Sequence, residues 1–173
     1  MEIRKGTPED VAAVASLYDA LNSYLEENTN YPGWKKGIYP IEEDASQAIE
    51  ENTLFVAEDG SRMIGTVILN HKPEQGYEQA DWNNDLDYSE ILVVHTFAVH
   101  PAYLRQGIGR NMMHWISDYA AGTGIKAVRL DVYEKNIPAI RMYEAAGFEY
   151  IATADLGYGK YGLGNFRLYQ KVL

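Results

Sequence analysis

The amino-acid sequence predicts an α/β fold of the α+β type, in which helices cover the faces of a mixed sheet. Three observations carry this prediction. Segments with apolar residues at helical spacing are interleaved with segments in which polar and apolar residues alternate. Their order along the chain is β-α-α-β-β-β-α-β-α-β-β, which fits helices packed on the faces of one sheet. The 173 residues contain no internal repeat and no linker, so we expect a single domain over residues 1–173.

The first two elements are a short strand and an amphipathic helix. A brief alternation over residues 2–5 predicts the strand. Thr7 followed by Pro8 is typical of a helix start, because the first turn leaves its N–H groups unpaired and proline has none to lose. Apolar residues then recur at helical spacing and predict a helix packed on a core: Val11, Val14, Ala15, Tyr18, Leu21 and Leu25.

An aromatic loop follows this helix. The segment "NTNYPGWKKGIYP" contains two prolines and two glycines, which break both periodicities, and it carries Tyr31, Trp34 and Tyr39. Loops supply binding residues more often than their length suggests. Two interpretations are open: a lid or wall over a small-molecule site, or a loop held in place by its own aromatic rings.

The middle of the chain predicts one helix and three strands. Residues 41–51 form the short helix, and "TLFVAEDGSRMIGTVILNH" indicates a hairpin that turns at Asp59 and Gly60. The polar, acidic segment 72–88 is expected to be a loop near one end of the sheet. The run "EILVVHTFAV" is the most strand-like in the chain.

The last third predicts two helices and three strands. Asn136 is placed to cap the second helix, with Pro138 in its first turn and Gly147 at its end. The glycine-rich "GYGKYGLG" joins the last two strands as a hairpin loop, since no Ser or Thr follows its lysine as a phosphate loop requires. The periodic positions behind these elements are Ile108, Met112, Ile116 and Tyr119 for the first helix and Val128, Leu130 and Val132 for the strand between them.

Composition excludes several classes of protein. The chain has 15 Lys and Arg against 25 Asp and Glu, a net charge of −10 without a basic stripe, so we expect no nucleic-acid partner. A cationic small molecule is compatible with this charge, although acidity also serves solubility alone. The absence of cysteine excludes disulfides and thiolate metal sites and fits a cytoplasmic location. No apolar run approaches the ~18 residues of a membrane span, so we expect no membrane partner.

A glycine pair marks a possible phosphate site. Gly107 and Gly109 lie where a strand passes into a helix, with Arg105 and Arg110 beside them. The start of a helix presents unpaired N–H groups and partial positive charge, and glycine lets a ligand oxygen approach the backbone closely. The third glycine of a dinucleotide fingerprint is missing. The alternative is an ordinary tight turn between strand and helix.

Two motifs give these observations a family context. "AVHPAYLRQGIGRNMM" resembles the acyl-CoA pyrophosphate loop of the GNAT superfamily of N-acetyltransferases, and "NIPAIRMYEAAGF" resembles the downstream motif of that superfamily. The resemblance covers essentially the whole chain. It implies a mixed, mostly antiparallel sheet of six or seven strands with about four helices on its faces, and acetyl-CoA as co-substrate. One departure is Leu104, where the family often carries Gln or Arg, so Arg105 is expected to substitute.

The resemblance also implies residues that bind the cofactor. The backbone around Ala98, at Phe97 and Val99, should pair with the pantetheine arm like an added strand. Asn136 should contact the cofactor arm, with a plain helix cap as the alternative. The pyrophosphate should be lined by Arg105, Gln106, Gly107, Ile108, Gly109 and Arg110.

The implied reaction is direct attack of an amine on the acetyl thioester. Tyr143 matches the family tyrosine and is expected to protonate the departing thiolate, the alternative being one more buried aromatic ring. For the base that accepts the ammonium proton the candidates are His95, Glu90 and a chain of water molecules. The remaining histidines show no ligand spacing, so we expect no metal. Asp131 either faces the acceptor or is solvated.

The sequence therefore predicts an acetyl-CoA-dependent N-acetyltransferase that acts on the primary amine of a small cationic molecule. One alternative is an enzyme of the same class that acts on a protein or peptide. The other is a non-catalytic sensor that binds acyl-CoA. A homodimer is common in the superfamily, and nothing in the sequence decides the acceptor or the oligomeric state.

Overall fold

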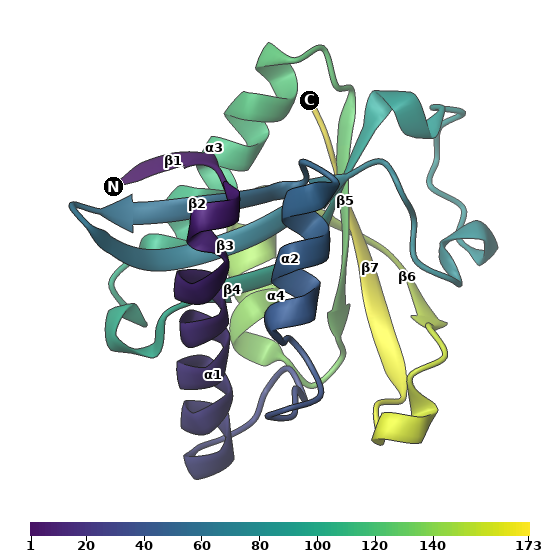
Figure 1. Cartoon of the computed structure of the whole chain (residues 1–173). Coiled ribbons are helices and arrows are strands. Elements are labelled where there is room, and N and C mark those ends of the chain that lie inside the picture. Colours follow the sequence, from purple (N-terminus) through teal and green to yellow (C-terminus); the bar gives the residue numbers. More distant parts are fainter. The chain divides into compact units, whose positions relative to one another are not determined.

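Seven strands and four α-helices make up the computed structural model, which describes residues 1–173 (Figure 1). Their order along the chain is the predicted one. None of the helices combines the length and the apolar character needed to cross a membrane. The strands are β1 Glu2–Lys5, β2 Leu54–Asp59, β3 Arg62–Asn70, β4 Ile91–Val99, β5 Ala127–Tyr133, β6 Glu149–Asp155 and β7 Asn165–Val172. The helices are α1 Val11–Glu27, α2 Glu42–Glu50, α3 Ile108–Gly122 and α4 Ile137–Ala145.

The strands form one sheet in the order β1-β2-β3-β4-β5-β7-β6. β4 and β5 run parallel, whereas β1–β2, β2–β3, β5–β7 and β6–β7 are antiparallel. The predicted fold class, a mixed and mostly antiparallel sheet with four helices, is confirmed.

The chain divides into two compact units. The first comprises Met1–Asn30, Trp34–Leu69 and His95–Met112, and the second comprises Tyr31–Gly33, Asn70–Val94 and Met113–Leu173. β4 and α3 pass from one unit into the other, so each unit holds part of both elements.

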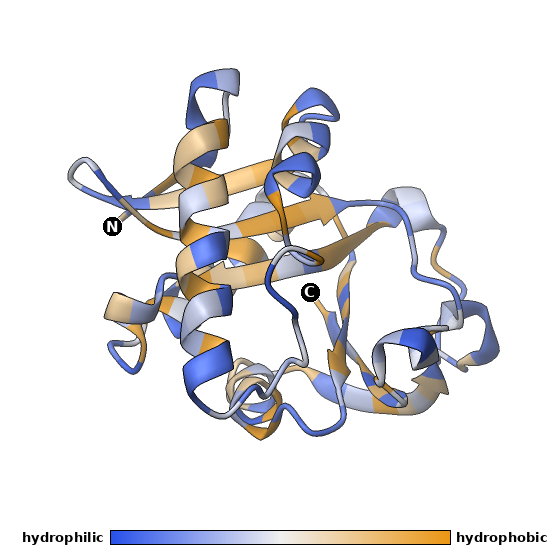
Figure 2. Cartoon of the chain, turned by 60° about the horizontal axis from the view of Figure 1, so that its bottom comes forward, coloured by the Kyte–Doolittle hydropathy of each residue, from blue (hydrophilic) through white to orange (hydrophobic).

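In the first unit, α1 and α2 run side by side over β2 (Figure 1). The predicted apolar face of α1 is buried there, with Val14 and Tyr18 at most 1% exposed. Figure 2 shows the same pattern, because β2 and β3 are mostly hydrophobic in colour while α1 carries both colours. Burying a side chain of this size contributes about 1.5–3 kcal/mol, so this core holds the unit together.

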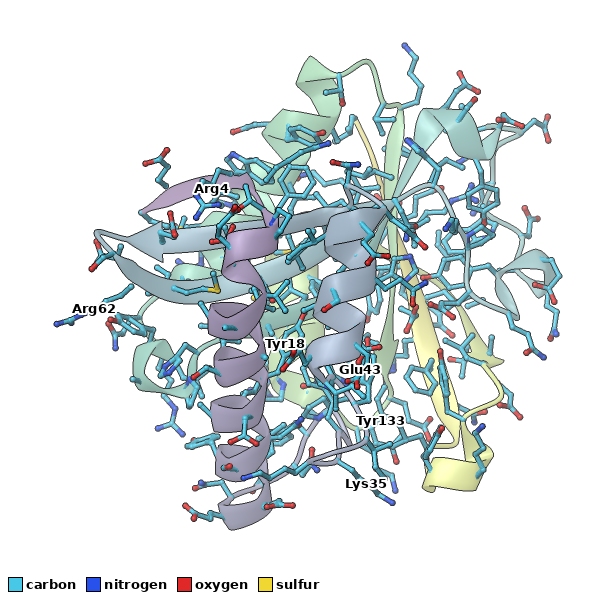
Figure 3. All side chains as sticks on the ribbon, viewed as in Figure 1. Arg4, Tyr18, Lys35, Glu43, Arg62 and Tyr133 are labelled. Atoms are coloured by element: carbon cyan, nitrogen blue, oxygen red, sulfur yellow. The ribbon has the colours of Figure 1, made fainter.

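The entry to α1 is fixed by a charged cluster. The chain first makes a 3-10 turn, Pro8–Asp10, and Asp10 Oδ2 accepts hydrogen bonds from the N–H and the hydroxyl of Thr7. Arg4, labelled in Figure 3, donates to both carboxylate oxygens of Asp10 at 2.7 and 2.9 Å and also to Glu58. The hydrogen bond from Arg4 is the main reason why the pKa of Asp10 is lowered to about 2.

Three polar side-chain atoms are fully buried in the first unit: Tyr18 Oη, Asn22 Oδ1 and Thr66 Oγ1. Figure 3 shows Tyr18 between α1 and α2. Its burial raises the pKa of the phenol to about 12. Tyr18 therefore contributes packing rather than charge at physiological pH.

In the second unit, β5 differs from the prediction by being covered on both faces. Val128, Leu130 and Val132 are buried as expected, but Arg129 on the opposite face is also only 3% exposed. The guanidinium donates to the side chains of Gln170, Tyr88 and Asn84, and it lies 4.1 Å from the ring of Trp82. Segment 72–88 was expected to be a loop near one end of the sheet. It packs on the sheet, because its aromatic rings supply a second core.

Candidate functional site

β4 changes conformation in its second half. Thr96 has φ +46°, a left-handed conformation that costs a β-branched residue about 1–3 kcal/mol. The register of β4 with β5 runs from Ile91 to Val94, two residues before this point. A kink therefore redirects β4 where its pairing with β5 ends.

After the kink, the side chains alternate between core and surface. Ala98 is 1% exposed and packs in the core under α1 and α2, whereas Phe97 and Val99 are half-buried. A Cβ on Gly65 of β3 would lie 3.1 Å from the carbonyl oxygen of Ala98, so the two backbones approach closely here. The part of β4 predicted to bind the cofactor thus lies close against β3.

A short turn joins β4 to α3. His100 Nδ1 accepts the N–H of Ala102 and caps a 3-10 turn, Pro101–Tyr103. Arg105 and Gly107 both have positive φ, +61° and +80°, and Gln106 donates to the carbonyl of Ala102. These contacts fold the loop back on itself immediately before α3.

The start of α3 is open to solvent. Arg105, Gln106, Gly107 and Arg110 are exposed, and nothing lies within 4 Å of the position that a Cβ on Gly107 would occupy. Because the N–H groups of the first turn have no carbonyl four residues earlier in the helix, they remain available to an anion. Two exposed guanidinium groups beside them add positive charge.

Asn136 and Tyr143 lie at the start of α4 and on it, in the second unit. The Oδ1 of Asn136 accepts the N–H of Ala139 at 3.4 Å, so its side chain caps the helix. Tyr143 is 6% exposed, and its ring packs 6.1 Å from that of Phe148. Burial raises the pKa of Tyr143 above the ordinary value, and Asp131 raises it further. The phenol therefore keeps its proton at physiological pH.

Comparison with known proteins identifies the family. A model of the acetyltransferase (GNAT) family matches residues 14–148, which is more than half of the chain. The chain belongs to the acetyltransferase (GNAT) family. Both motifs singled out in the sequence lie within or at the end of the matched range.

Two enzymes of known acceptor are similar to this chain. The ribosomal protein bS18-alanine N-acetyltransferase of Escherichia coli is 28% identical over 122 residues, covering 70% of this chain and 76% of that protein. The S-(2-succino)cysteine N-acetyltransferase of Bacillus subtilis is 27% identical over 113 residues, covering 64% and 63%. The chain spans only 15% of the length of a further relative, from Mycobacterium leprae, to which it is 45% identical over 58 residues.

Solved structures agree on the fold. An acetyltransferase of the GNAT family from Streptococcus agalactiae has a TM-score of 0.81 at 19% identity, covering 99% of this chain and 95% of that one. The yncA protein of Salmonella typhimurium, solved with its cofactor acetyl-CoA, has a TM-score of 0.67 at 17% identity, covering 99% and 93%. At these identities the likeness concerns the fold alone.

In this GNAT chain, the sequence did not predict the contacts of two carboxylates in the second unit, Asp131 and Glu74. Tyr77, which is fully buried, donates its hydroxyl to Asp131 Oδ1 at 2.8 Å. Tyr158 donates to Glu74 Oε2 at 3.2 Å. Burial raises the pKa of both tyrosines, and both carboxylates add to the rise. The two acids therefore share one region of negative potential. The alternation in "LDVY" placed Asp131 opposite the core, but nothing local predicts its contact with Tyr77, 54 residues away.

The candidates for the catalytic base differ in their surroundings. His95 is half-buried on β4, one residue before the kink at Thr96. Glu90 Oε2 accepts the N–H of Asp87 and caps a 3-10 turn at the start of the strand. No group of three or more His, Cys, Asp or Glu side chains is arranged to hold a metal ion. Glu90 thus caps a turn, whereas His95 lies on β4 next to the residues predicted to bind the cofactor.

Proposed function

We propose that this chain is an N-acetyltransferase that transfers the acetyl group of acetyl-CoA to the primary amine of a small cationic molecule. The observation that carries the proposal is the strand, turn and open helix start at β4 and α3, found in a chain of the GNAT family. The turn supplies the three things that a pyrophosphate needs: exposed N–H groups, a glycine without obstruction and flanking arginines.

The cofactor residues follow from this arrangement. The pantetheine arm pairs with the backbone of Phe97 and Val99 after the kink, on either side of the buried Ala98. The pyrophosphate takes the N–H groups of Gly107, Ile108 and Gly109, with Arg105, Gln106 and Arg110 around it. Asn136 caps α4 with its amide oxygen, which leaves the two N–H donors of its amide for the cofactor arm.

The reaction moves two protons, and we assign one residue to each. The neutral amine attacks the thioester carbonyl and forms a tetrahedral oxyanion, from which the C–S bond breaks. His95 accepts the proton that the amine nitrogen loses, and Tyr143 donates its proton to the leaving sulfur. Burial and Asp131 raise the pKa of Tyr143, so the phenol is protonated at physiological pH but is a weaker acid than an exposed tyrosine. The assignment of Tyr143 as the acid therefore rests on its place in the downstream motif of the GNAT family.

The carboxylates of the second unit support a cationic acceptor. Asp131 lies close enough to raise the pKa of Tyr143, the residue assigned to the reacting sulfur. Glu74 strengthens the same negative potential and accepts a hydrogen bond from Tyr158. The ring of Phe166 contacts the ring of Tyr158 edge-on and that of Tyr133 at a tilt. Carboxylates next to aromatic rings favour ammonium groups through charge and through cation–π attraction.

The experiment is thiol release from acetyl-CoA across a panel of polyamines, aryl amines, amino acids, aminoglycosides and peptides with N-terminal alanine. We expect the fastest turnover with a di- or polyamine. Asp131→Asn should raise the KM for that amine about tenfold, because it removes one charge-assisted contact to the ammonium group. The KM for acetyl-CoA should stay unchanged. The exposed Asp85→Asn is the matched control for removing one negative charge.

Other outcomes select the alternatives. Turnover of peptides alone would favour a protein acceptor, as the name of the Escherichia coli relative describes for that enzyme. A rise in Tm with acetyl-CoA and no thiol release with any amine would favour the acyl-CoA sensor. A cytoplasmic location and a possible homodimer complete the proposal, the first because a chain without cysteine suits a reducing compartment.

A further inference from the structure

The aromatic loop between α1 and α2 is anchored to α1 at its end. Figure 1 shows it crossing from the end of α1 to the start of α2. Asn22, 2% exposed on α1, donates its amide to the carbonyl oxygens of Tyr39 and Pro40 at 3.3 and 3.2 Å. The ring of Trp34 meets the ring of Tyr39 edge-on at 5.6 Å. The position of Tyr39 is therefore fixed by contacts to its backbone and to its ring.

The side chain of Tyr39 reaches the kink of β4. Its hydroxyl is hydrogen-bonded to Thr96 Oγ1, with the two oxygens 2.5 Å apart. Thr96 is 8% exposed and holds the left-handed conformation described above. The aromatic loop thus forms a hydrogen bond to the one residue of β4 whose backbone is strained.

A strained residue persists only where its surroundings fix it. Without the hydroxyl contact, Thr96 would gain by returning to the extended conformation of its neighbours. Such a return would turn His95 and Phe97 away from their present directions, because both adjoin Thr96 in the chain. The population of the present conformation then sets the apparent affinity for any ligand that needs it.

We propose that Tyr39 is a positioning residue that holds the kink at Thr96 and thereby keeps the cofactor strand of β4 ready to bind. In this role Tyr39 acts through its hydrogen bond to Thr96. The proposal rests on the function proposed above, because the cofactor strand is assigned there.

Three variants separate the strain from the hydrogen bond. Tyr39→Phe removes one partner of the bond and keeps the ring. Thr96→Val removes the other partner and keeps the branched, strained side chain. Thr96→Gly removes the bond together with the strain, because glycine adopts positive φ freely.

The expected affinities for acetyl-CoA follow from this logic. Tyr39→Phe and Thr96→Val should each raise the Kd about fivefold, the equilibrium factor of one ordinary hydrogen bond. Thr96→Gly should stay within about twofold of the wild type. Equal losses in Thr96→Gly and Thr96→Val would overturn the proposal, because they would mean that the hydroxyl itself contacts the ligand.

A matched control comes from the second unit. Tyr150 and Thr153 form an exposed hydrogen bond between the same two kinds of hydroxyl, at 2.9 Å. Tyr150→Phe and Thr153→Val should leave the Kd unchanged. Melting temperatures of all variants show whether a loss of affinity merely follows a loss of stability.

A second readout does not depend on the proposed function. The backbone chemical shifts of residues 95–97 report whether the chain at Thr96 is left-handed or extended. In Tyr39→Phe they should move toward extended values, and unchanged shifts would overturn the proposal whatever the affinity does. If the chemical shifts move in Tyr39→Phe but the wild type binds no acetyl-CoA, the proposed function is wrong. The stabilisation of the kink at Thr96 by Tyr39 is then still supported. Moved shifts with an unchanged Kd would refute the positioning role.

Discussion

Replacing Tyr143 by phenylalanine tests the proposed chemistry most directly, because the structure separates its effects on stability and on rate. Tyr143 is 6% exposed and its ring packs near Phe148. Phenylalanine keeps this packing, and the loss of one hydroxyl changes stability by about 1 kcal/mol. For a chain of this length that corresponds to a change in Tm of about 2–4 °C.

The expected effect on rate is much larger. General acid catalysis contributes about 10²–10⁴ in rate, or about 3–5 kcal/mol of transition-state stabilisation. Tyr143→Phe should therefore lower kcat at least a hundredfold and leave the Kd for acetyl-CoA within about threefold. The assay is thiol release at saturating acetyl-CoA and amine, with binding of acetyl-CoA measured separately. The exposed Tyr150→Phe serves as the control.

The pKa of Tyr143 adds a prediction about pH. Because burial and Asp131 raise this pKa, the acid form persists as the pH rises through the ordinary value of about 10. The wild-type rate should therefore show no decline due to this tyrosine between pH 7 and 10. An unchanged kcat in Tyr143→Phe, or a Kd that rises as much as kcat falls, would refute the assignment of Tyr143 as the acid.

Three further predictions concern stability, cofactor and base. The carboxylate of Asp10, whose pKa of about 2 lies below its ordinary 3.8, stabilises the fold above about pH 4, and this contribution is lost as the pH falls through 2. Asp10→Asn should therefore lower the free energy of unfolding by about 1–2 kcal/mol at pH 7, a value reduced for solvent screening because Arg4 is 35% exposed. The loss should be smaller at pH 3. Equal losses at the two pH values, measured by thermal unfolding, would contradict this. Gly107→Ala should reduce the affinity for acetyl-CoA about 5–30-fold, since alanine resists φ +80° by about 1–2 kcal/mol although it meets no atom, and calorimetric titration checks this against unaltered binding. His95→Ala should remove the acidic limb of the rate-versus-pH profile, and a profile of unaltered shape would assign the base to another group.

Local sequence patterns predicted the elements and their order. The helix start at Thr7 and Pro8, the hairpin at Gly60 and the cap at Asn136 all depend on residues within a few positions of one another. Periodicity likewise identified which face of α1 is buried. The turn before α3 was predicted for the same reason, because its glycine and the start of the helix are adjacent in the chain.

Long-range contacts escaped prediction. The alternation of β5 predicted its buried residues Val128, Leu130 and Val132, but it gave no sign that Arg129 is buried against Trp82, 47 residues earlier in the chain. The bond of Tyr77 to Asp131 spans 54 residues, and that of Tyr39 to Thr96 spans 57. No periodicity records such pairings, because each partner alone has an ordinary local sequence.

The sequence by itself therefore determined the order of elements, the helix start that suits a pyrophosphate and, through two motifs, the family. Only the tertiary structure decided which face of β5 is covered, where β4 kinks and which tyrosine lies against each acid. The physical reason is that secondary structure and turns are set by neighbours along the chain, whereas the surroundings of a charge or a strained residue are set by segments that packing brings together.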